Sequence, residues 1–320
     1  MQQKNIMIAV DGSDHSFETI RYVGNIIPPI AIAARIKLFH IMNPFPETFW
    51  DLEIDPENNH ASSIIQSWKQ RQEKFIQQFM EQALQLLKDA GFSEDTVTVD
   101  IKERQRGIAR DIADEAQRGY DAVVVGRRGY GDVEDLILGS IANKLVNRLH
   151  HFPIWVVGGC PDPNKILVAM DSSDGAMRAL EHVYYFLDKA HPHLLLLNVI
   201  RSFNDLQADK EQSSPLPSDN QLLEVAEKEM HKAKTEMSSI FDHCIRKLEQ
   251  KGADLSRIET KIVTGAGSRA GTIVEEAQKG AYGTIVIGRR GLSKVQEFFM
   301  GRVCNKVLQL AKEMSVFIIN

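Results

Sequence analysis

Two stretches of the sequence place glycines at a spacing suited to holding a phosphate. The first, GRRGYGDVEDLILGS, occupies residues 126–140, and the second, GRRGLSKVQEFFMGR, occupies residues 288–302. Each follows a short apolar run. Each ends in a dipeptide that begins with glycine, Gly-Ser or Gly-Arg, at the start of a helical pattern. Glycine allows positive φ and close approach of the backbone to a ligand. A helix N-terminus presents free N–H groups and the positive end of the helix dipole. The pattern therefore predicts a phosphate cradle built from two separated turns.

In the first stretch, the groups that would meet a phosphate are expected at both ends. Gly126 ends an apolar run, Gly129 follows three residues later, and Gly139 with Ser140 opens a helix. Ser140 is expected either to offer its hydroxyl to a phosphate or to cap the helix. A plain turn role for Gly126 and Gly129 is the alternative to a cradle.

Other phosphate-binding patterns do not account for these glycines. No GxxxxGK[ST] loop occurs, and the GxGxxG fingerprint belongs after a first strand, where this chain has DGSDHS. The sequence offers no Walker lysine, no recognisable catalytic base and no acidic pair beyond the glycine turn for metal-assisted phosphoryl transfer. We therefore predict phosphate binding without fast turnover, with no catalytic residue and no metal site.

The segments around the glycines alternate between strand-like and helix-like patterns. A 3.6-residue apolar period from Ile64 to Leu87 predicts a long amphipathic helix, and Ser13 is expected to cap a helix running to about Ile27. The predicted strands are Ile6–Val10, Ile36–Ile41, Val97–Ile101, Ala122–Val125, Pro153–Val157, Ile166–Met170, Leu194–Val199, Ile258–Val263, Thr284–Ile287 and Val316–Ile319. This alternation predicts an α/β fold with a parallel sheet covered on both faces, and ligands beyond the carboxyl ends of its strands.

The chain repeats itself. NIMIAVDGSDHSFETIRYV (5–23) is similar to KILVAMDSSDGAMRALEHV (165–183), and GIARDIADEAQRG (107–119) is similar to SRAGTIVEEAQKG (268–280). The stretch GGCPDPNK at 158–165 has the glycines and prolines of a linker. The chain of 320 residues is therefore expected to form two tandem doubly wound five-stranded domains, 1–158 and 165–320.

A first strand ending in aspartate, followed after the fourth strand by G-x2-G-x9-G-[ST], resembles the universal stress protein family. The resemblance covers nearly the whole chain as two copies. It implies the strand order 3-2-1-4-5 in each copy and packing of the copies through their fifth strands as an intramolecular pseudo-dimer. It also implies binding of ATP or a related adenine nucleotide, with or without Mg²⁺. In ATP-binding members, the aspartate and a backbone group after the second strand hold adenosine, while the glycine turns hold ribose and phosphates.

The first half retains every position that the resemblance assigns to the nucleotide. These are Asp11, Ile41, Gly126, Arg128, Gly129, Gly139, Ser140 and Ile141. The tentative second site consists of Asp171, Val199, Gly288, Arg290, Gly291, Gly301 and Arg302.

The second half departs from the family pattern at Arg302, where the family has Ser or Thr. An arginine can pair with a phosphate, or with a carboxylate of the chain itself that leaves the cradle empty. The bulky Phe298, Phe299 and Met300 precede it and favour an empty cradle. We therefore expect one tightly bound nucleotide per chain, in the first half.

Composition narrows the class of protein. The net charge of -5 argues against a nucleic-acid binder driven by phosphate contacts. Three widely spaced cysteines favour a reducing compartment over a disulfide framework. No apolar stretch approaches the length of a membrane span, so we expect a cytoplasmic protein without membrane contact. Whether the chain also forms a homodimer is left open.

A few other residues attract functional hypotheses that we set aside. Arg127 and Arg289 are expected to be solvated surface charges. The triplet DHC at 242–244 lies in a helical segment, where adjacent side chains diverge, so a solvated His243 beside a packed Cys244 is expected rather than a metal site.

The favoured interpretation is a nucleotide-binding stress or signalling protein that acts by ligand-dependent association. A slow ATPase and an apo scaffold with relic cradles are the alternatives.

Overall fold

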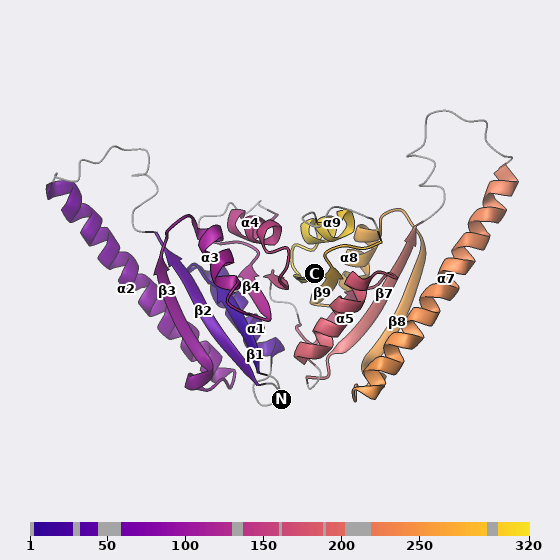
Figure 1. Ribbon diagram of the computed structural model, residues 1–320, viewed down its shortest axis with the longest axis horizontal. Helices are drawn as coiled ribbons and strands as arrows, with labels where there is room; N and C mark the ends of the chain where they lie inside the picture. Colours follow the sequence, from indigo (N-terminus) through magenta and orange to yellow (C-terminus); the bar gives the residue numbers. More distant parts are fainter. Residues whose placement is uncertain are drawn as a thin grey trace. The chain divides into compact units, whose positions relative to one another are not determined.

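The chain forms two compact units, Met1–Gly158 and Gly159–Asn320, each built as an α/β sandwich. The computed structural model describes residues 3–27, 33–43, 59–129, 137–159, 162–187, 190–201, 219–292 and 300–320. Figure 1 shows strands of each unit running side by side, with the long helices α2 and α7 beside the outer strands β3 and β8. The α/β class predicted from alternating strand and helix patterns is confirmed.

The first unit contains five parallel strands in the order β3-β2-β1-β4-β5. Their bounds are β1 (Lys4–Ala9), β2 (Ala34–Met42), β3 (Val97–Glu103), β4 (Ala122–Gly126) and β5 (Ile154–Val157). Ile8 of β1 lies opposite Leu38 of β2 on one side and Val124 of β4 on the other. The almost continuous apolar character of β1 and β4 fits this central position, because both faces of these strands are buried.

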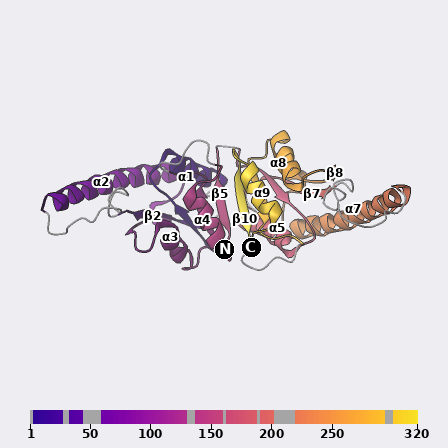
Figure 2. The ribbon, with the colours of Figure 1, turned by 90° about the horizontal axis from the view of Figure 1, so that it is seen from above.

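Helices cover both faces of this sheet. Their bounds are α1 (Asp14–Ile26), α2 (Asn59–Asp89), α3 (Ile108–Ala116) and α4 (Ser140–Arg148), and a short 3₁₀ turn, η2 (Glu94–Thr96), precedes β3. Figure 2 shows α1 and α2 on one face and α3 and α4 on the other. The reversal of strand order between β2, β1 and β4 leaves the carboxyl ends of these strands open toward the loops, which is where ligands bind in such sheets.

The second unit repeats the arrangement in the order β8-β7-β6-β9-β10. Its strands are β6 (Lys165–Ala169), β7 (His193–Arg201), β8 (Ile258–Ala266), β9 (Thr284–Gly288) and β10 (Ser315–Ile319). Its helices are α5 (Asp174–Leu187), α7 (Asp219–Gln250), α8 (Arg269–Lys279) and α9 (Arg302–Leu310), with a 3₁₀ turn η3 (Leu255–Arg257) before β8. The ten strands predicted from apolar runs all correspond to observed strands.

Of the two helix caps considered from the sequence, the structure confirms the one at Ser13 but not the one at Ser140. Ser13 caps α1 and its hydroxyl accepts from the Ser16 N–H, as predicted. Ser140 is not a cap: it is the first residue of α4, and Gly139 occupies the cap position with extended backbone. The Ser140 side chain is therefore exposed at the helix start rather than folded back on the backbone.

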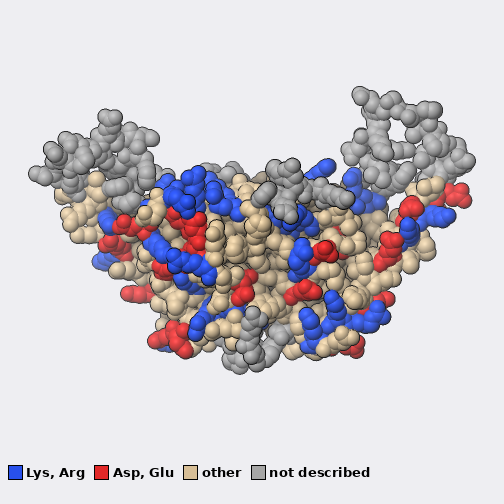
Figure 3. Space-filling model, viewed as in Figure 1, with Lys and Arg blue, Asp and Glu red and all other residues tan. Residues whose placement is uncertain are grey.

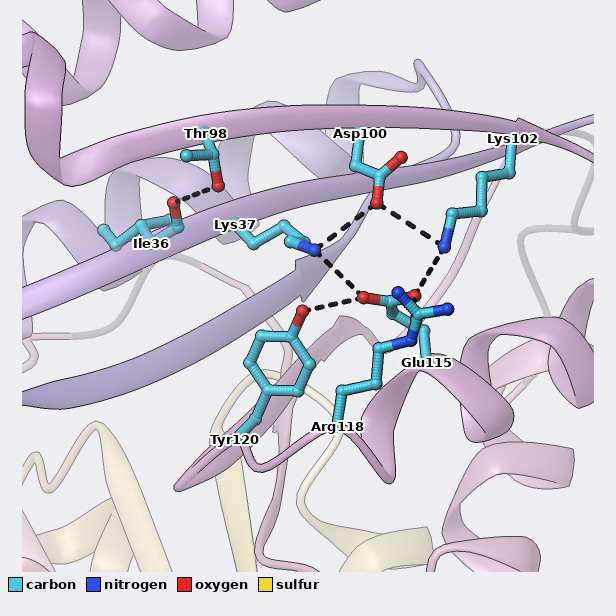
Figure 4. Close-up of polar contacts among 8 residues, drawn as sticks. All are labelled: Ile36, Lys37, Thr98, Asp100, Lys102, Glu115, Arg118 and Tyr120. Atoms are coloured by element: carbon cyan, nitrogen blue, oxygen red, sulfur yellow. Dashed lines mark hydrogen bonds and ion pairs between the residues drawn. The ribbon is translucent and has the colours of Figure 1, made fainter.

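A polar cluster ties α3 to the sheet of the first unit. The Glu115 carboxylate, whose side chain is 2% exposed, accepts from Lys37 at 2.9 Å, from Lys102 at 2.6 Å and from the Tyr120 hydroxyl at 2.9 Å. Figure 4 shows these side chains converging from β2, β3 and the end of α3, with Arg118 on the same carboxylate. Burial by itself raises the pKa of Glu115, but hydrogen bonds from Lys102, Lys37 and Tyr120 outweigh it and bring the pKa to about 2. The cluster fixes the position of α3, which matters because α3 lines the cavity described below.

The charges on the surface are mixed in sign. Figure 3 shows acidic and basic side chains interspersed over the visible face. In the described part of the chain, no helix is long and apolar enough to cross a membrane.

Candidate functional site

A cavity of about 910 Å³ opens at the carboxyl ends of the strands in the first unit. Three groups of residues line it: the ends of β1, β2 and β4, the two glycine turns with the start of α4, and side chains from α1, α2 and α3. Its volume lies near the upper end of the range of about 300–1,000 Å³ common for small-molecule pockets.

All eight residues that the sequence assigns to the first-half site line this one cavity: Asp11, Ile41, Gly126, Arg128, Gly129, Gly139, Ser140 and Ile141. They come from four separate segments of the chain. The parallel sheet brings them together because the carboxyl ends of its strands all lie at the same edge.

Asp11 lies at the end of β1 and organises the turn that follows. Its Oδ1 accepts from the Ser13 N–H at 3.0 Å, the Ser13 hydroxyl at 2.6 Å and the Ser16 hydroxyl at 2.7 Å. The carboxylate therefore serves the local turn and lines the cavity at the same time. These bonds orient the carboxylate against the turn.

Backbone hydrogen bonds join the two glycine turns. The Gly139 N–H donates to the Arg127 carbonyl at 2.8 Å, and the Arg127 N–H donates to Val157 at 2.7 Å. The second unit repeats both bonds: Gly301 donates to the Arg289 carbonyl at 2.9 Å and Arg289 donates to Ile319 at 2.6 Å. The start of each helix is thus fixed beside the end of the fourth strand, which is the geometry that a cradle requires.

The expectation that Arg127 and Arg289 are solvated is wrong. Arg127 is 3% exposed and Arg289 is 1% exposed. Each continues its strand by one backbone bond to the fifth strand, so its side chain starts inside the fold. Arg127 reaches the Ile137 carbonyl with Nη1 at 3.4 Å and so joins the first turn to the segment before Gly139.

Gly126 is required by close packing. A Cβ at this position would lie 3.0 Å from the Arg128 carbonyl oxygen and 3.1 Å from the Thr19 hydroxyl of α1. A side chain here would push the turn away from α1, so the glycine allows the end of the strand to approach the helix.

The far end of the cavity is apolar. Ile41 and Met42 lie at the end of β2, while Ile108 and Ile112 come from α3. Ile41 and Met42 lie on the opposite side of β1 from the glycine turns, because β2 and β4 flank β1. His40 also lines the cavity, and burial lowers the pKa of its imidazole against the opposing effects of the Val10 carbonyl and the Asp11 carboxylate.

The sequence did not predict one wall of the cavity. Trp68, Arg71, Gln72 and Phe75 of α2 line the cavity together with Ile76. The apolar period of α2 included Trp68 and Phe75, but as part of the stripe that faces the core. No motif distinguishes them, since the direction in which a long helix crosses the strand ends is a tertiary feature.

In the second unit, some of the tentative residues also lie close together. A Cβ on Gly291 would lie 2.6 Å from the Asp171 Oδ2, and a Cβ on Gly301 would lie 3.6 Å from the Arg290 Cα. Gly288 is packed against the backbone of Gly175, where a Cβ would lie 2.7 Å from the carbonyl carbon. The turn geometry of the cradle is therefore present in both halves.

Two arginines mark the second unit as different. The Val199 carbonyl, counterpart of the Ile41 carbonyl, accepts from the Arg269 Nε at 3.3 Å. Arg302 is the first residue of α9 and its side chain is exposed. Among the described residues no carboxylate pairs with Arg302, so the partner expected from the sequence is not found there. Phe298 and Phe299 lie outside the described residues, and Met300 is half-buried.

Within the ranges that the structure describes, no group of three or more His, Cys, Asp or Glu side chains could hold a metal ion. The prediction for the DHC triplet is confirmed: His243 is exposed and Cys244 is fully buried. Burial raises the pKa of the Cys244 thiol, as expected for a packed cysteine.

Similarity to known proteins agrees with the duplicated architecture. Universal stress protein YxiE of Bacillus subtilis is 26% identical over 148 residues, which is 46% of this chain and 93% of that protein. A universal stress protein of Mycolicibacterium smegmatis is 24% identical over 206 residues, covering 63% of this chain and 65% of that protein.

Solved structures share the fold along the whole chain. A universal stress protein from Archaeoglobus fulgidus DSM 4304 has a TM-score of 0.62 at 18% identity and covers 100% of this chain and 99% of that one. A protein of unknown function from Pseudomonas aeruginosa PAO1 has a TM-score of 0.53 at 14% identity and covers 99% of this chain and 92% of that one.

The universal stress protein family, finally, matches the chain twice, at residues 3–158 and again at residues 163–319. Together the two matches span almost the entire sequence, and each contains one aspartate-ended first strand and one pair of glycine turns. The chain is therefore a tandem, two-domain member of the universal stress protein family.

Proposed function

We propose that the first half binds an adenine nucleotide such as ATP, and that the protein acts in stress response or signalling through ligand-dependent association rather than through fast catalysis. The observation that carries the proposal is a single cavity of about 910 Å³ that joins a glycine cradle at the start of α4 to an apolar end. A nucleotide has the same two ends, an anionic chain of phosphates and a flat base.

Each end has groups suited to its part of the ligand. Ser140 opens α4 and places a hydroxyl and the first N–H groups of the helix at the positive end of its dipole, where phosphates are stabilised. Arg128 adds a cation at the first turn. Ile41, Ile108 and Ile112 supply the apolar surface for the base, and Asp11 lies between the two ends within reach of a ribose hydroxyl.

The cavity suits binding better than turnover. Among its described lining residues, Asp11 is the one carboxylate, and the local turn already uses its Oδ1. Mg²⁺ entering with ATP would therefore take most of its ligands from phosphate and water. This favours a receptor for the nucleotide over a rapid ATPase.

The proposal extends to the assembly and the compartment. The two halves pair through β5 and β10, since both strands are apolar and would otherwise leave edges open to aggregation. Cys244 and Cys304 are free thiols, which favours a reducing, cytoplasmic location. No nucleic acid and no membrane take part.

The test is calorimetric titration of ATP into the wild-type chain and into Gly129→Val. A branched side chain at Gly129 fills the first turn of the cradle, so binding is expected to fall at least tenfold while the fold, followed by circular dichroism, is retained. Equal affinities in the two proteins would refute the site. Sedimentation with and without ATP then tests association: a sedimentation coefficient that ATP leaves unchanged would contradict that part of the proposal.

A further inference from the structure

One face of α2 borders the nucleotide cavity. Trp68, Arg71, Gln72 and Phe75 follow the spacing i, i+3, i+4 and i+7, which places them on one side of a helix. We refer to these four residues as the α2 wall. Figure 1 shows α2 alongside β3, with its amino-terminal part extending past the strands. The wall therefore continues the cavity outward from the ends of the strands.

The Phe75 ring is seated against the turn that follows Asp11. A Cβ on Gly12 would lie 2.8 Å from Cε1 of Phe75, and Gly12 has a φ of +87° that glycine adopts without strain. Phe75 is nevertheless 44% exposed, and it lines the cavity. An exposed aromatic face beside a polar cradle gains stability when a flat group covers it.

The second half replaces the two aromatic residues of the α2 wall with acidic ones, and it keeps a cation, Lys232, in the place of Arg71. The register of the two long helices is set by their buried residues, which are Ile76, Met80, Ala83 and Leu87 in α2 and Met237, Phe241, Cys244 and Leu248 in α7. In this register Trp68 and Phe75 correspond to Glu229 and Glu236, both exposed.

Neighbouring positions change together with the wall. Ser172 follows Asp171 where Gly12 follows Asp11, so the small residue that receives the Phe75 ring is also replaced. Arg269 stands in the place of Ile108 and donates to the Val199 carbonyl at the apolar end. The glycine turns, by contrast, keep the same backbone bonds in both halves.

We propose that the α2 wall, and not the glycine turns, determines which half of the chain accepts an adenine nucleotide. Phe75 and Trp68 offer ring faces to the planar base, and Arg71 adds a cation at the mouth. Glu229 and Glu236 put carboxylates at the corresponding positions of the second half, where they repel a polyphosphate. The inference rests on the proposed function, because it concerns the selectivity of that site.

The experiment transfers the second-half residue into the first half. Calorimetric titration of ATP compares wild type, Phe75→Glu and Gln78→Glu; Gln78 is an exposed residue of α2 outside the cavity lining and controls for added charge on the same helix. Phe75→Glu is expected to weaken ATP binding at least tenfold, and Gln78→Glu is expected to match wild type. Equal affinities for Phe75→Glu and Gln78→Glu would overturn the inference.

A second comparison separates contact with the base from an effect of charge. Phe75→Leu keeps an apolar side chain but removes the ring, so ATP binding should weaken severalfold while binding of inorganic tripolyphosphate, which has no base, stays unchanged. Equal weakening for both probes overturns recognition of the base. The proposed function fails separately, if the wild-type chain does not bind ATP or if Gly129→Val binds it equally well.

Discussion

The imidazole of His40 bridges the ends of two strands, because its Nδ1 donates to the Val10 carbonyl at 2.9 Å. A carbonyl oxygen only accepts, so this nitrogen carries the hydrogen. The second half makes the same bridge with an amide: Asn198 Nδ2 donates to the Met170 carbonyl at 2.8 Å. One structural task is thus performed by a titratable group in the first half and by a neutral one in the second.

His40→Asn is expected to reduce the pH dependence of stability. Burial lowers the pKa of His40, so the folded state favours the neutral ring. The contribution of the neutral His40 ring to the free energy of unfolding is fully present above the unfolded pKa of about 6.5. It decreases as the pH falls through the lower pKa of the folded state. Urea unfolding between pH 7 and pH 5 should show a smaller loss for His40→Asn than for wild type, and parallel profiles would contradict the assignment. Asn198→His is the reverse variant, expected to add a pH dependence.

Glu115→Gln is expected to destabilise the first half by about 2–3 kcal/mol, since two lysines lose a buried carboxylate partner. The effect should appear at neutral pH as a lower urea midpoint. Because the folded pKa of Glu115 is about 2, its contribution is fully present above the ordinary value of 4.5. It is lost as the pH falls from there toward 2, so wild type and variant should converge in acid.

The control for this variant is Glu276→Gln in the second half. Glu276 pairs with Lys261 and Lys279 but its side chain is 12% exposed, so a smaller loss is expected. If both variants lowered the urea midpoint equally, the buried cluster around Glu115 would contribute no more to stability than the pairs of Glu276.

Gly12→Ala is expected to cost about 1–2 kcal/mol of stability and to weaken ATP binding. The φ of +87° strains any residue with a Cβ, and that Cβ would meet the Phe75 ring at 2.8 Å. The double variant Gly12→Ala with Phe75→Leu removes the clash but keeps the backbone strain. Its thermal unfolding midpoint should therefore recover only the part of the lost stability that is due to the clash. Full recovery would show that backbone strain contributes nothing.

Titration of ATP should give one tight site per chain. The backbone bonds of the cradle turns are alike in the two halves, but Arg269 engages the Val199 carbonyl, and Glu229 and Glu236 stand where the first half has Trp68 and Phe75. Two equivalent tight sites would disprove this expectation, and so would a nucleotide located in a co-crystal only beside Asp171 and Gly288.

Each half expressed alone should self-associate or lose stability. β5 and β10 are apolar strands at the end of their own sheets, and an uncovered edge of this kind pairs with another chain. Sedimentation of the fragments 1–158 and 159–320 provides the measurement. Two well-behaved monomers with unchanged unfolding midpoints would exclude pairing through these strands.

Some features were readable from the sequence because they depend on local chemistry. The apolar run Ala122–Val125 is short and rich in β-branched valine, which favours a strand, and Ser13 caps a helix through its own neighbours. The repeat and the glycine spacing were likewise sufficient to predict that Asp11, Gly129 and Ser140 meet, because the carboxyl ends of parallel strands share one edge.

Other features were decided only by the tertiary structure. Arg127 reads as a surface charge, yet the backbone bond to Val157 places its side chain inside the fold. Phe75 reads as a core residue, yet the path of α2 past the ends of the strands leaves its ring at the cavity. In both cases, residues far away in the sequence determine what surrounds the side chain, and no local pattern encodes their position.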